Sequence, residues 1–152
     1  MSSAALTAFT KAWGGSYHEA KPVTEAALVM AEQELGSELP RSYKSAILRA
    51  GLPSPTIELL DFICDHEIDL PDLSDFHSPE DIASSTIDWR EMGMPEHLIA
   101  FASDCSGNLF AFPTSTTGNR DEVWFFDHDF GTSDKLADSF EDWLNLYNSL
   151  KN

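Results

Sequence analysis

The chain has 152 residues, of which 42% are hydrophobic and 11% aromatic. This composition is typical of one folded domain that buries a full core. Its 26 acidic residues against nine basic ones give a net charge of -17. A field of that sign repels phosphate backbones and anionic lipid, which argues against nucleic acid and membrane as partners. It attracts basic proteins, although the acidity could also serve only to keep the protein in solution.

Targeting signals and cysteine usage favour the cytoplasm. No apolar run approaches the roughly 20 residues of a membrane span. Residues 1–6 lack the basic start and the continuous apolar stretch of a secretory signal. The two cysteines, Cys64 and Cys105, lie far apart in the sequence, and reduced thiols are favoured over a disulfide. We therefore expect a cytoplasmic protein.

Three helices are expected before the chain reaches its acidic middle. Thr24 is a suitable N-cap for the second helix, which ends at Gly36, and the third helix ends at Gly51. The first helix covers residues 2–13 and stops at Gly14-Gly15. Its apolar stripe at i, i+3 and i+7 consists of Leu6, Phe9 and Trp13.

The segment 50–89 differs in charge, because it holds ten acidic residues and no Lys or Arg. Within it, residues 56–64 are predicted to form a strand, since their large apolar side chains suit a pleated surface. Residues 71–77 are predicted to be loop. Ser78, followed by a proline and two acids, is a strong helix start, and this helix is expected to end at Gly93.

The centre of the fold is predicted to be an antiparallel meander. Gly107 and Asn108 accept positive φ easily and suit the first reversal, and a polar loop at 114–122 with the turn signal Gly118-Asn119 makes the second. The three strands are expected at residues 94–102, 109–112 and 123–126.

A polar link at 127–135 then leads to a last helix capped by Ser139, whose inner face packs on the sheet. Helices, then an antiparallel sheet, then a helix predict an α+β fold with a mostly antiparallel sheet, as a single domain over residues 1–152. Hairpin-length connections cannot join parallel strands, so a doubly wound nucleotide-binding fold is not expected.

Signals for chemistry are few. Asp127-His128-Asp129 follows a strand and could hold a metal ion with help from 65–67, but neighbouring strand residues point to opposite faces. Cys105 lies in a turn among carboxylates, which raise a thiol pKa and make it a poor nucleophile. The motifs of phosphate-binding loops, α/β-hydrolases and zinc proteases are absent from the sequence. No enzyme activity, metal or cofactor is therefore expected.

Several short segments form one ordered pattern along the chain. They are, in order, Glu34-Leu35-Gly36, Leu39-Pro40-Arg41-Ser42-Tyr43-Lys44, Ala50-Gly51, Trp89, Pro95-Glu96-His97-Leu98-Ile99-Ala100-Phe101-Ala102, Gly107-Asn108-Leu109-Phe110-Ala111-Phe112, Val123-Trp124-Phe125-Phe126-Asp127 and Ser139-Phe140-Glu141-Asp142-Trp143-Leu144. Together these segments resemble the SUKH superfamily, which is named partly for a yeast cell-wall-assembly regulator and includes bacterial toxin immunity proteins. The resemblance covers roughly residues 24 to 147. It implies an α+β fold, no enzyme activity and no catalytic residues.

The resemblance implies an immunity protein that neutralises a cognate toxin, often a nuclease or deaminase. Nucleases are basic where they meet phosphate, so an acidic inhibitor suits them. The alternatives are a regulatory scaffold of the same fold and, third, a small metal-dependent hydrolase using residues 127–129. The residues expected to bind the partner are Glu58, Asp61, Asp65, Glu67, Asp69, Asp72, Asp75, Asp104 and Trp124.

Overall fold

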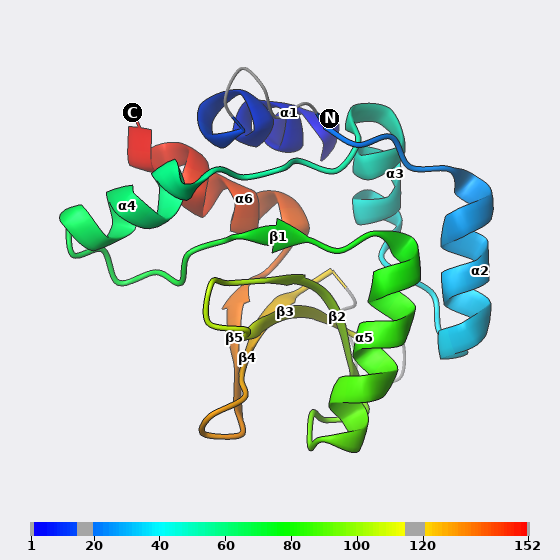
Figure 1. Cartoon of the computed structure of the whole chain (residues 1–152). Coiled ribbons are helices and arrows are strands. Elements are labelled where there is room, and N and C mark those ends of the chain that lie inside the picture. Colours follow the sequence, from blue (N-terminus) through cyan, green and yellow to red (C-terminus); the bar gives the residue numbers. More distant parts are fainter. Residues whose placement is uncertain (1, 15–19, 115–120, 152) are drawn as a thin grey trace.

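The computed structural model describes residues 2–14, 20–114 and 121–151, and in that part an antiparallel sheet lies beneath a layer of helices (Figure 1). The strands are β1 (Asp75–Phe76), β2 (Leu98–Ser103), β3 (Leu109–Pro113), β4 (Val123–Asp127) and β5 (Thr132–Ala137). They pair in sequence order, each antiparallel to the next. The prediction of an α+β fold built on an antiparallel meander is therefore confirmed. The loop predicted at 114–122 lies largely outside the described residues.

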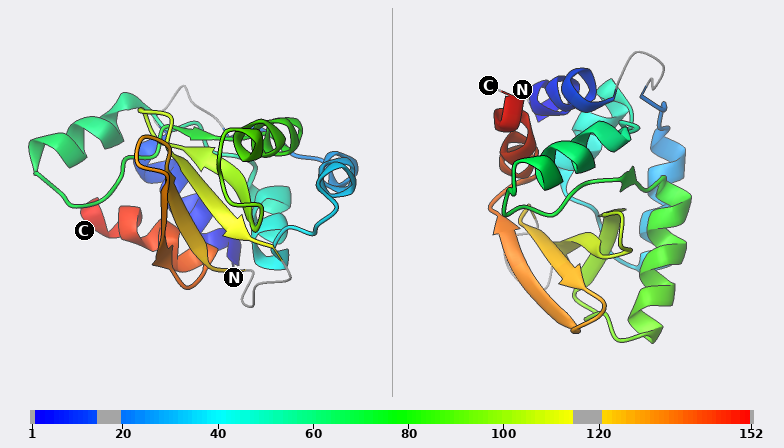
Figure 2. Two further views of the ribbon diagram at one scale, coloured as in Figure 1. Left: turned by 90° about the horizontal axis from the view of Figure 1, so that it is seen from below. Right: turned by 60° about the vertical axis from the view of Figure 1, so that its left-hand side comes forward.

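Helices cover one face and one side of this sheet. They are α1 (Ser2–Trp13), α2 (Glu25–Leu35), α3 (Arg41–Ala50), α4 (Ile57–Asp65), α5 (Pro79–Glu91) and α6 (Phe140–Asn148), followed by a 3-10 turn at Ser149–Lys151. The helix α1 packs on both α3 and α6 above the sheet, α2 packs on α5, and α4 projects at the opposite end from α2 (Figures 1 and 2). Both chain ends lie at the α1–α6 end of the molecule. Within the described residues, no helix is both long and apolar enough to cross a bilayer.

The predicted helix ends are confirmed at the positions where the sequence has a capping residue. The hydroxyl oxygens of Thr24, Ser78 and Ser139 each accept a hydrogen bond from the backbone N–H three residues on, which satisfies one of the free donors at a helix start. At the other end of α2, Gly36 adopts the left-handed conformation with φ 65°.

Three secondary-structure predictions were wrong. The segment predicted as a strand at 56–64 lies in the helix α4, whose start is capped by Thr56. Leu59 and Ile63 lie one helical turn apart and are both buried. The expected loop at 71–77 contains the edge strand β1, and the expected link at 127–135 leads into the edge strand β5. An edge strand of this kind is polar on its exposed side chains and is held by backbone pairing with its neighbour.

The core follows the alternation of the strands. Ile99, Phe110 and Phe112 point into the main core under α1, α3 and α6, whereas Leu98 and Ala111 point into a smaller cluster on the opposite face of the sheet. In the main core the ring of Tyr43 on α3 lies 4.9 to 5.5 Å from the rings of three phenylalanines, which are Phe101, Phe112 and Phe140.

Side chains of α5 complete the open edge of β2. The strand β1 is only two residues long, so it leaves part of that edge without a backbone partner. There the hydroxyl of Thr86 accepts from Ala100 N at 3.0 Å and donates to Ala100 O at 3.4 Å. Arg90 Nη2 donates to Leu98 O at 3.1 Å. The helix α5 is thereby fixed against the sheet next to β1.

Candidate interaction surface

Most of the predicted partner-binding acids lie on one projecting segment. We call residues 57–69, which comprise α4 and the turn after it, the α4 arm. Glu58 pairs with Lys151 Nζ at 2.7 Å. The other four acids of the arm have no ion-pair partner in the described part of the chain. These exposed residues are Asp61, Asp65, Glu67 and Asp69.

One acid of the α4 arm holds an unfavourable backbone conformation. Glu67 has a positive φ of 50°, alone among the non-glycine residues of the described chain. It follows the end of α4, a position that glycine usually takes, because any other L-residue pays about 1–2 kcal/mol there. The chain thus places an exposed carboxylate where a glycine would suit the backbone better. Strained residues cluster at functional positions.

Three of the predicted contact residues make hydrogen bonds within the fold, and their role in binding a partner stays a prediction. The Asp72 carboxylate is buried, with 7% of the residue exposed, and accepts from Ser74 Oγ at 2.7 Å and from Cys105 N at 3.1 Å. Asp104 accepts three hydrogen bonds within the β2–β3 turn. Trp124 is half-buried, and its Nε1 donates to Glu122 Oε1 at 3.2 Å.

The environment of Cys105 agrees with the expected poor nucleophile. Burial raises the pKa of its thiol, and Asp72 and Asp104 raise it further. Desolvation is the largest cause of the raised pKa, and the neighbouring carboxylates raise it in the same direction, as the sequence predicts.

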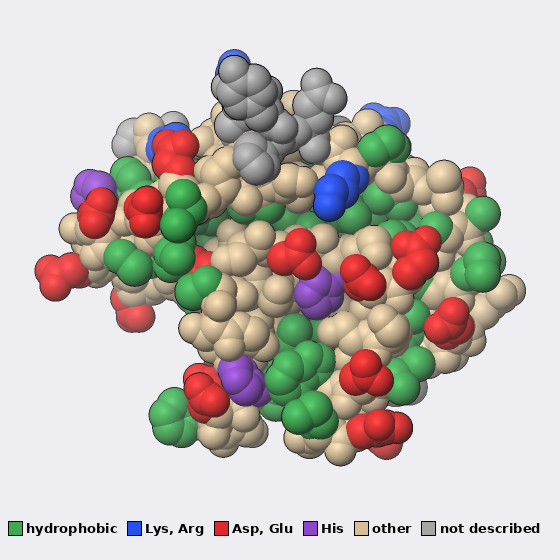
Figure 3. All heavy atoms as spheres, viewed as in Figure 1, with side chains coloured by type: hydrophobic (Ala, Val, Ile, Leu, Met, Phe, Trp, Pro, Cys, Tyr) green, Lys and Arg blue, Asp and Glu red, His purple; other side chains and the backbone are tan. Residues whose placement is uncertain are grey.

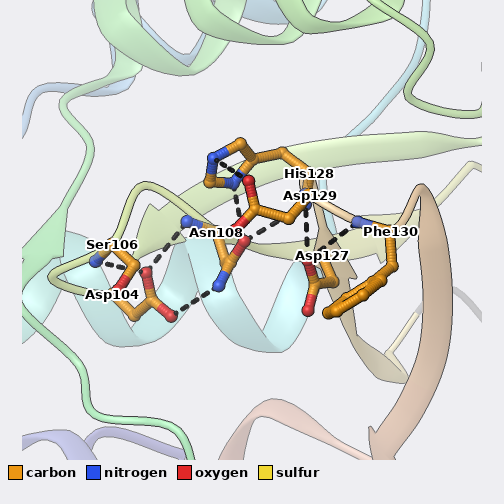
Figure 4. Close-up of polar contacts among 7 residues, drawn as sticks. All are labelled: Asp104, Ser106, Asn108, Asp127, His128, Asp129 and Phe130. Atoms are coloured by element: carbon orange, nitrogen blue, oxygen red, sulfur yellow. Dashed lines mark hydrogen bonds and ion pairs between the residues drawn. The ribbon is translucent and has the colours of Figure 1, made fainter.

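The residues proposed as metal ligands build a turn (Figure 4). Asp127 Oδ1 accepts from the backbone N–H groups of Asp129 and Phe130 at 2.9 and 3.2 Å. His128 Nδ1 donates to Asn108 Oδ1 at 2.6 Å, since an amide oxygen can only accept. In the described ranges no group of three His, Cys, Asp or Glu residues is placed to hold a metal ion. The three side chains thus do not converge on one point.

An acidic groove runs between β1 and α5. Of the predicted partner-binding residues, Asp75 is the one that lines it. It consists of two adjoining hollows of about 320 and 280 Å³ that share Asp75 and Asp81. The first hollow reaches Lys21 and Glu80, and the second reaches Asp88. Figure 3 shows acidic side chains spread over β1, α5 and α4 on this face, with few basic ones.

The sequence matches the SMI1 / KNR4 family (SUKH-1) over residues 22–146. The chain belongs to this family. The match begins after α1, which nevertheless completes the core, because Leu6, Phe9 and Trp13 are fully buried. No curated protein matches the sequence.

In this SUKH-1 chain the most exposed aromatic side chain of the described part is Phe130, with 81% exposed, at the tip of the β4–β5 turn. The sequence pattern does not single out Phe130, because residues 127–135 have the polar composition of a link. An aromatic side chain among carboxylates is a good interface anchor.

Proposed function

We propose that this SUKH-1 protein is an immunity-type protein, which binds a basic toxin domain through its acidic surface and blocks it. The observation that carries the proposal is the α4 arm, where four carboxylates project into solvent with no ion-pair partner in the described chain. Unpaired like charges on one segment repel one another. A cationic surface that docks there relieves this repulsion.

The strained Glu67 supports the same conclusion. Its φ of 50° costs stability that a glycine would recover. A carboxylate kept at that point is explained by a contact outside the chain, because the side chain has no ion-pair partner within the described residues. A nuclease toxin suits this surface, since its phosphate-binding face is necessarily basic. Deaminase domains that act on nucleic acid have the same requirement.

The experiment measures binding between the purified chain and the small basic domain of a secreted protein encoded beside it. The affinity should fall at least about tenfold between about 50 and about 300 mM salt, because charge attraction is screened over that range. An affinity that is independent of salt, or no binding at low salt, would refute the proposal.

A matched pair of variants assigns the contact to the α4 arm. Asp61→Asn/Asp65→Asn removes two charges from the arm and should weaken binding at least about fivefold, or about 1 kcal/mol. Glu34→Gln/Asp134→Asn removes two exposed charges elsewhere and should change it less than about twofold. Equal losses in the two variants would mean that only the net charge matters.

A further inference from the structure

An apolar hollow lies at the base of the α4 arm, and we call it the Ile57 hollow. It measures about 280 Å³ and lies between the start of α4, the segment before β1 and the β2–β3 turn. Among the described residues, no acidic or basic side chain lines it. An apolar group can therefore enter the hollow without removing an ion from water. Its walls are formed mainly by Pro55, Ile57, Leu60, Leu73 and Cys105.

The side of α4 that borders this hollow carries an exposed apolar stripe. Ile57 is 70% exposed, Leu60 is half-buried and Cys64 is exposed. These residues lie at i, i+3 and i+7, so they follow one line along the helix. Leu59 and Ile63 pack into the main core from another side of the same helix. The helix α4 is thus apolar on two sides and buries only one of them within the fold.

Acids of the α4 arm border the exposed stripe. Asp61 and Asp65 follow Ile57 by four and eight residues, which places them on the adjoining side of the helix. Neither has an ion-pair partner in the described chain. Figure 3 shows hydrophobic side chains beside acidic ones over α4. An apolar centre with a polar rim is the anatomy of a protein-binding surface, and this rim is negative.

The charge of the rim selects the occupant of the hollow. A second copy of the chain would also bring a net charge of -17, and like charges facing each other across a contact oppose it. Anionic lipid and nucleic acid are repelled for the same reason. A basic protein offers an apolar side chain to the hollow and Lys or Arg to the rim, so it matches both parts of the surface.

We propose that the Ile57 hollow receives one large apolar side chain of the basic protein partner, next to Lys or Arg residues that pair with Asp61 and Asp65. This inference rests on the proposed function, and it adds an anchor that does not depend on charge. Interfaces concentrate their binding energy in such an apolar side chain, enclosed by a ring of weaker polar contacts. The hollow supplies affinity, and the acids supply attraction and orientation.

The test measures the affinity of the full chain for the basic domain encoded beside it, at about 50 and about 300 mM salt. Ile57→Ser should weaken binding at least about tenfold, or about 1.4 kcal/mol. The factor should be the same at both salt concentrations, because an apolar contact is not screened. The loss caused by Asp61→Asn/Asp65→Asn should shrink at the higher concentration. Met30→Ser is the matched control, since it removes a side chain on α2 that is 62% exposed, and it should change binding less than about twofold.

Filling the hollow is an independent perturbation. In the Cys64→Ser chain, N-ethylmaleimide can alkylate the exposed Cys105, which lines the hollow. The adduct should weaken binding at least about tenfold. The same treatment of Cys64→Ser/Cys105→Ser, which has no thiol, should leave binding unchanged. Binding that survives both Ile57→Ser and the adduct overturns the inference.

The outcomes separate this inference from the proposed function. If Asp61→Asn/Asp65→Asn weakens binding and Ile57→Ser does not, the inference fails and the proposed function stands. If no basic domain binds the chain, the proposed function fails and the assignment of the hollow to a basic partner fails with it. If sedimentation shows that the chain alone is a dimer, which Ile57→Ser dissociates, a second copy covers the hollow and the inference is wrong.

Discussion

Replacing Asn108 with alanine should loosen the sheet, because this side chain joins two of its turns (Figure 4). Asn108 Nδ2 donates to Asp104 Oδ2 at 3.1 Å in the β2–β3 turn. Asn108 Oδ1 accepts from His128 N at 3.1 Å and from His128 Nδ1 at 2.6 Å in the β4–β5 turn. Three hydrogen bonds are lost together, of which two join residues 20 apart in the sequence and one lies within the β2–β3 turn.

The magnitude follows from these bonds. A neutral hydrogen bond contributes about 1 kcal/mol net, and one to a charged group about 1.5–3 kcal/mol. The site is half-buried, so water replaces part of the loss, and about 2 kcal/mol is expected for Asn108→Ala. For a chain of this size that lowers the Tm by about 4–8 °C.

Urea and thermal unfolding followed by circular dichroism measure this change. Asn145→Ala is the matched control, because Asn145 is exposed on α6 and should change stability by less than about 0.5 kcal/mol. A double-mutant cycle with His128→Ala should give a coupling energy of about 1 kcal/mol. A loss below about 0.5 kcal/mol for Asn108→Ala, or no coupling to His128, would show that these bonds do not tie the turns.

Four further changes test the fold and the groove. Thr86→Val should lower the free energy of unfolding in urea by about 1–3 kcal/mol, because it leaves the buried Ala100 N–H unpaired. Thr86→Ser keeps the hydroxyl and should retain most of that stability. An equal loss in both variants would contradict the role of the hydroxyl. Gly51→Ala should destabilise by at least about 1–3 kcal/mol, since φ is +80° and the new Cβ would lie 2.8 Å from a backbone oxygen; an unchanged Tm would be inconsistent with that conformation. Glu67→Gly should stabilise the chain by about 0.5–1 kcal/mol, and a lower Tm would show that the backbone is not strained. Burial holds the pKa of His77 below 6.5 in the folded chain, so the unfolded chain binds the proton more tightly. The free energy of unfolding should therefore fall as the pH drops through about 6.5. His77→Asn should depend less on pH in that range, and an identical pH dependence would exclude His77 as the cause.

The sequence predicted best those elements that carry their own start signal. Ser78 and Ser139 cap helices whose boundaries match the structure closely, because a cap acts on backbone groups only three residues away. The reversal at Gly107 was also predicted, since glycine favours it and apolar strands flank it, but the strand expected from residue 94 begins only at Leu98.

The run at 57–65 could not be assigned from periodicity alone. Its apolar residues fit both a strand and a helix, and the helix leaves Ile57 70% exposed. The edge strands β1 and β5 were missed for a related reason. Their hydrogen bonds come from β2 and β4, and side-chain pattern carries little information about backbone pairing at a sheet edge.

By itself, the sequence determined the family fold, the caps and the excess of acid, because each depends on local contacts or on composition. Only the tertiary structure decided which acids make hydrogen bonds within the fold and which stay exposed. It turned Asp72 inward to hold a loop and engaged Asp104 in a turn, while it placed Asp81 and Asp88 around the buried ring of His77. The physical reason is that a carboxylate accepts hydrogen bonds from donors that folding brings near it. The spacing of residues along the chain does not predict which donors these are.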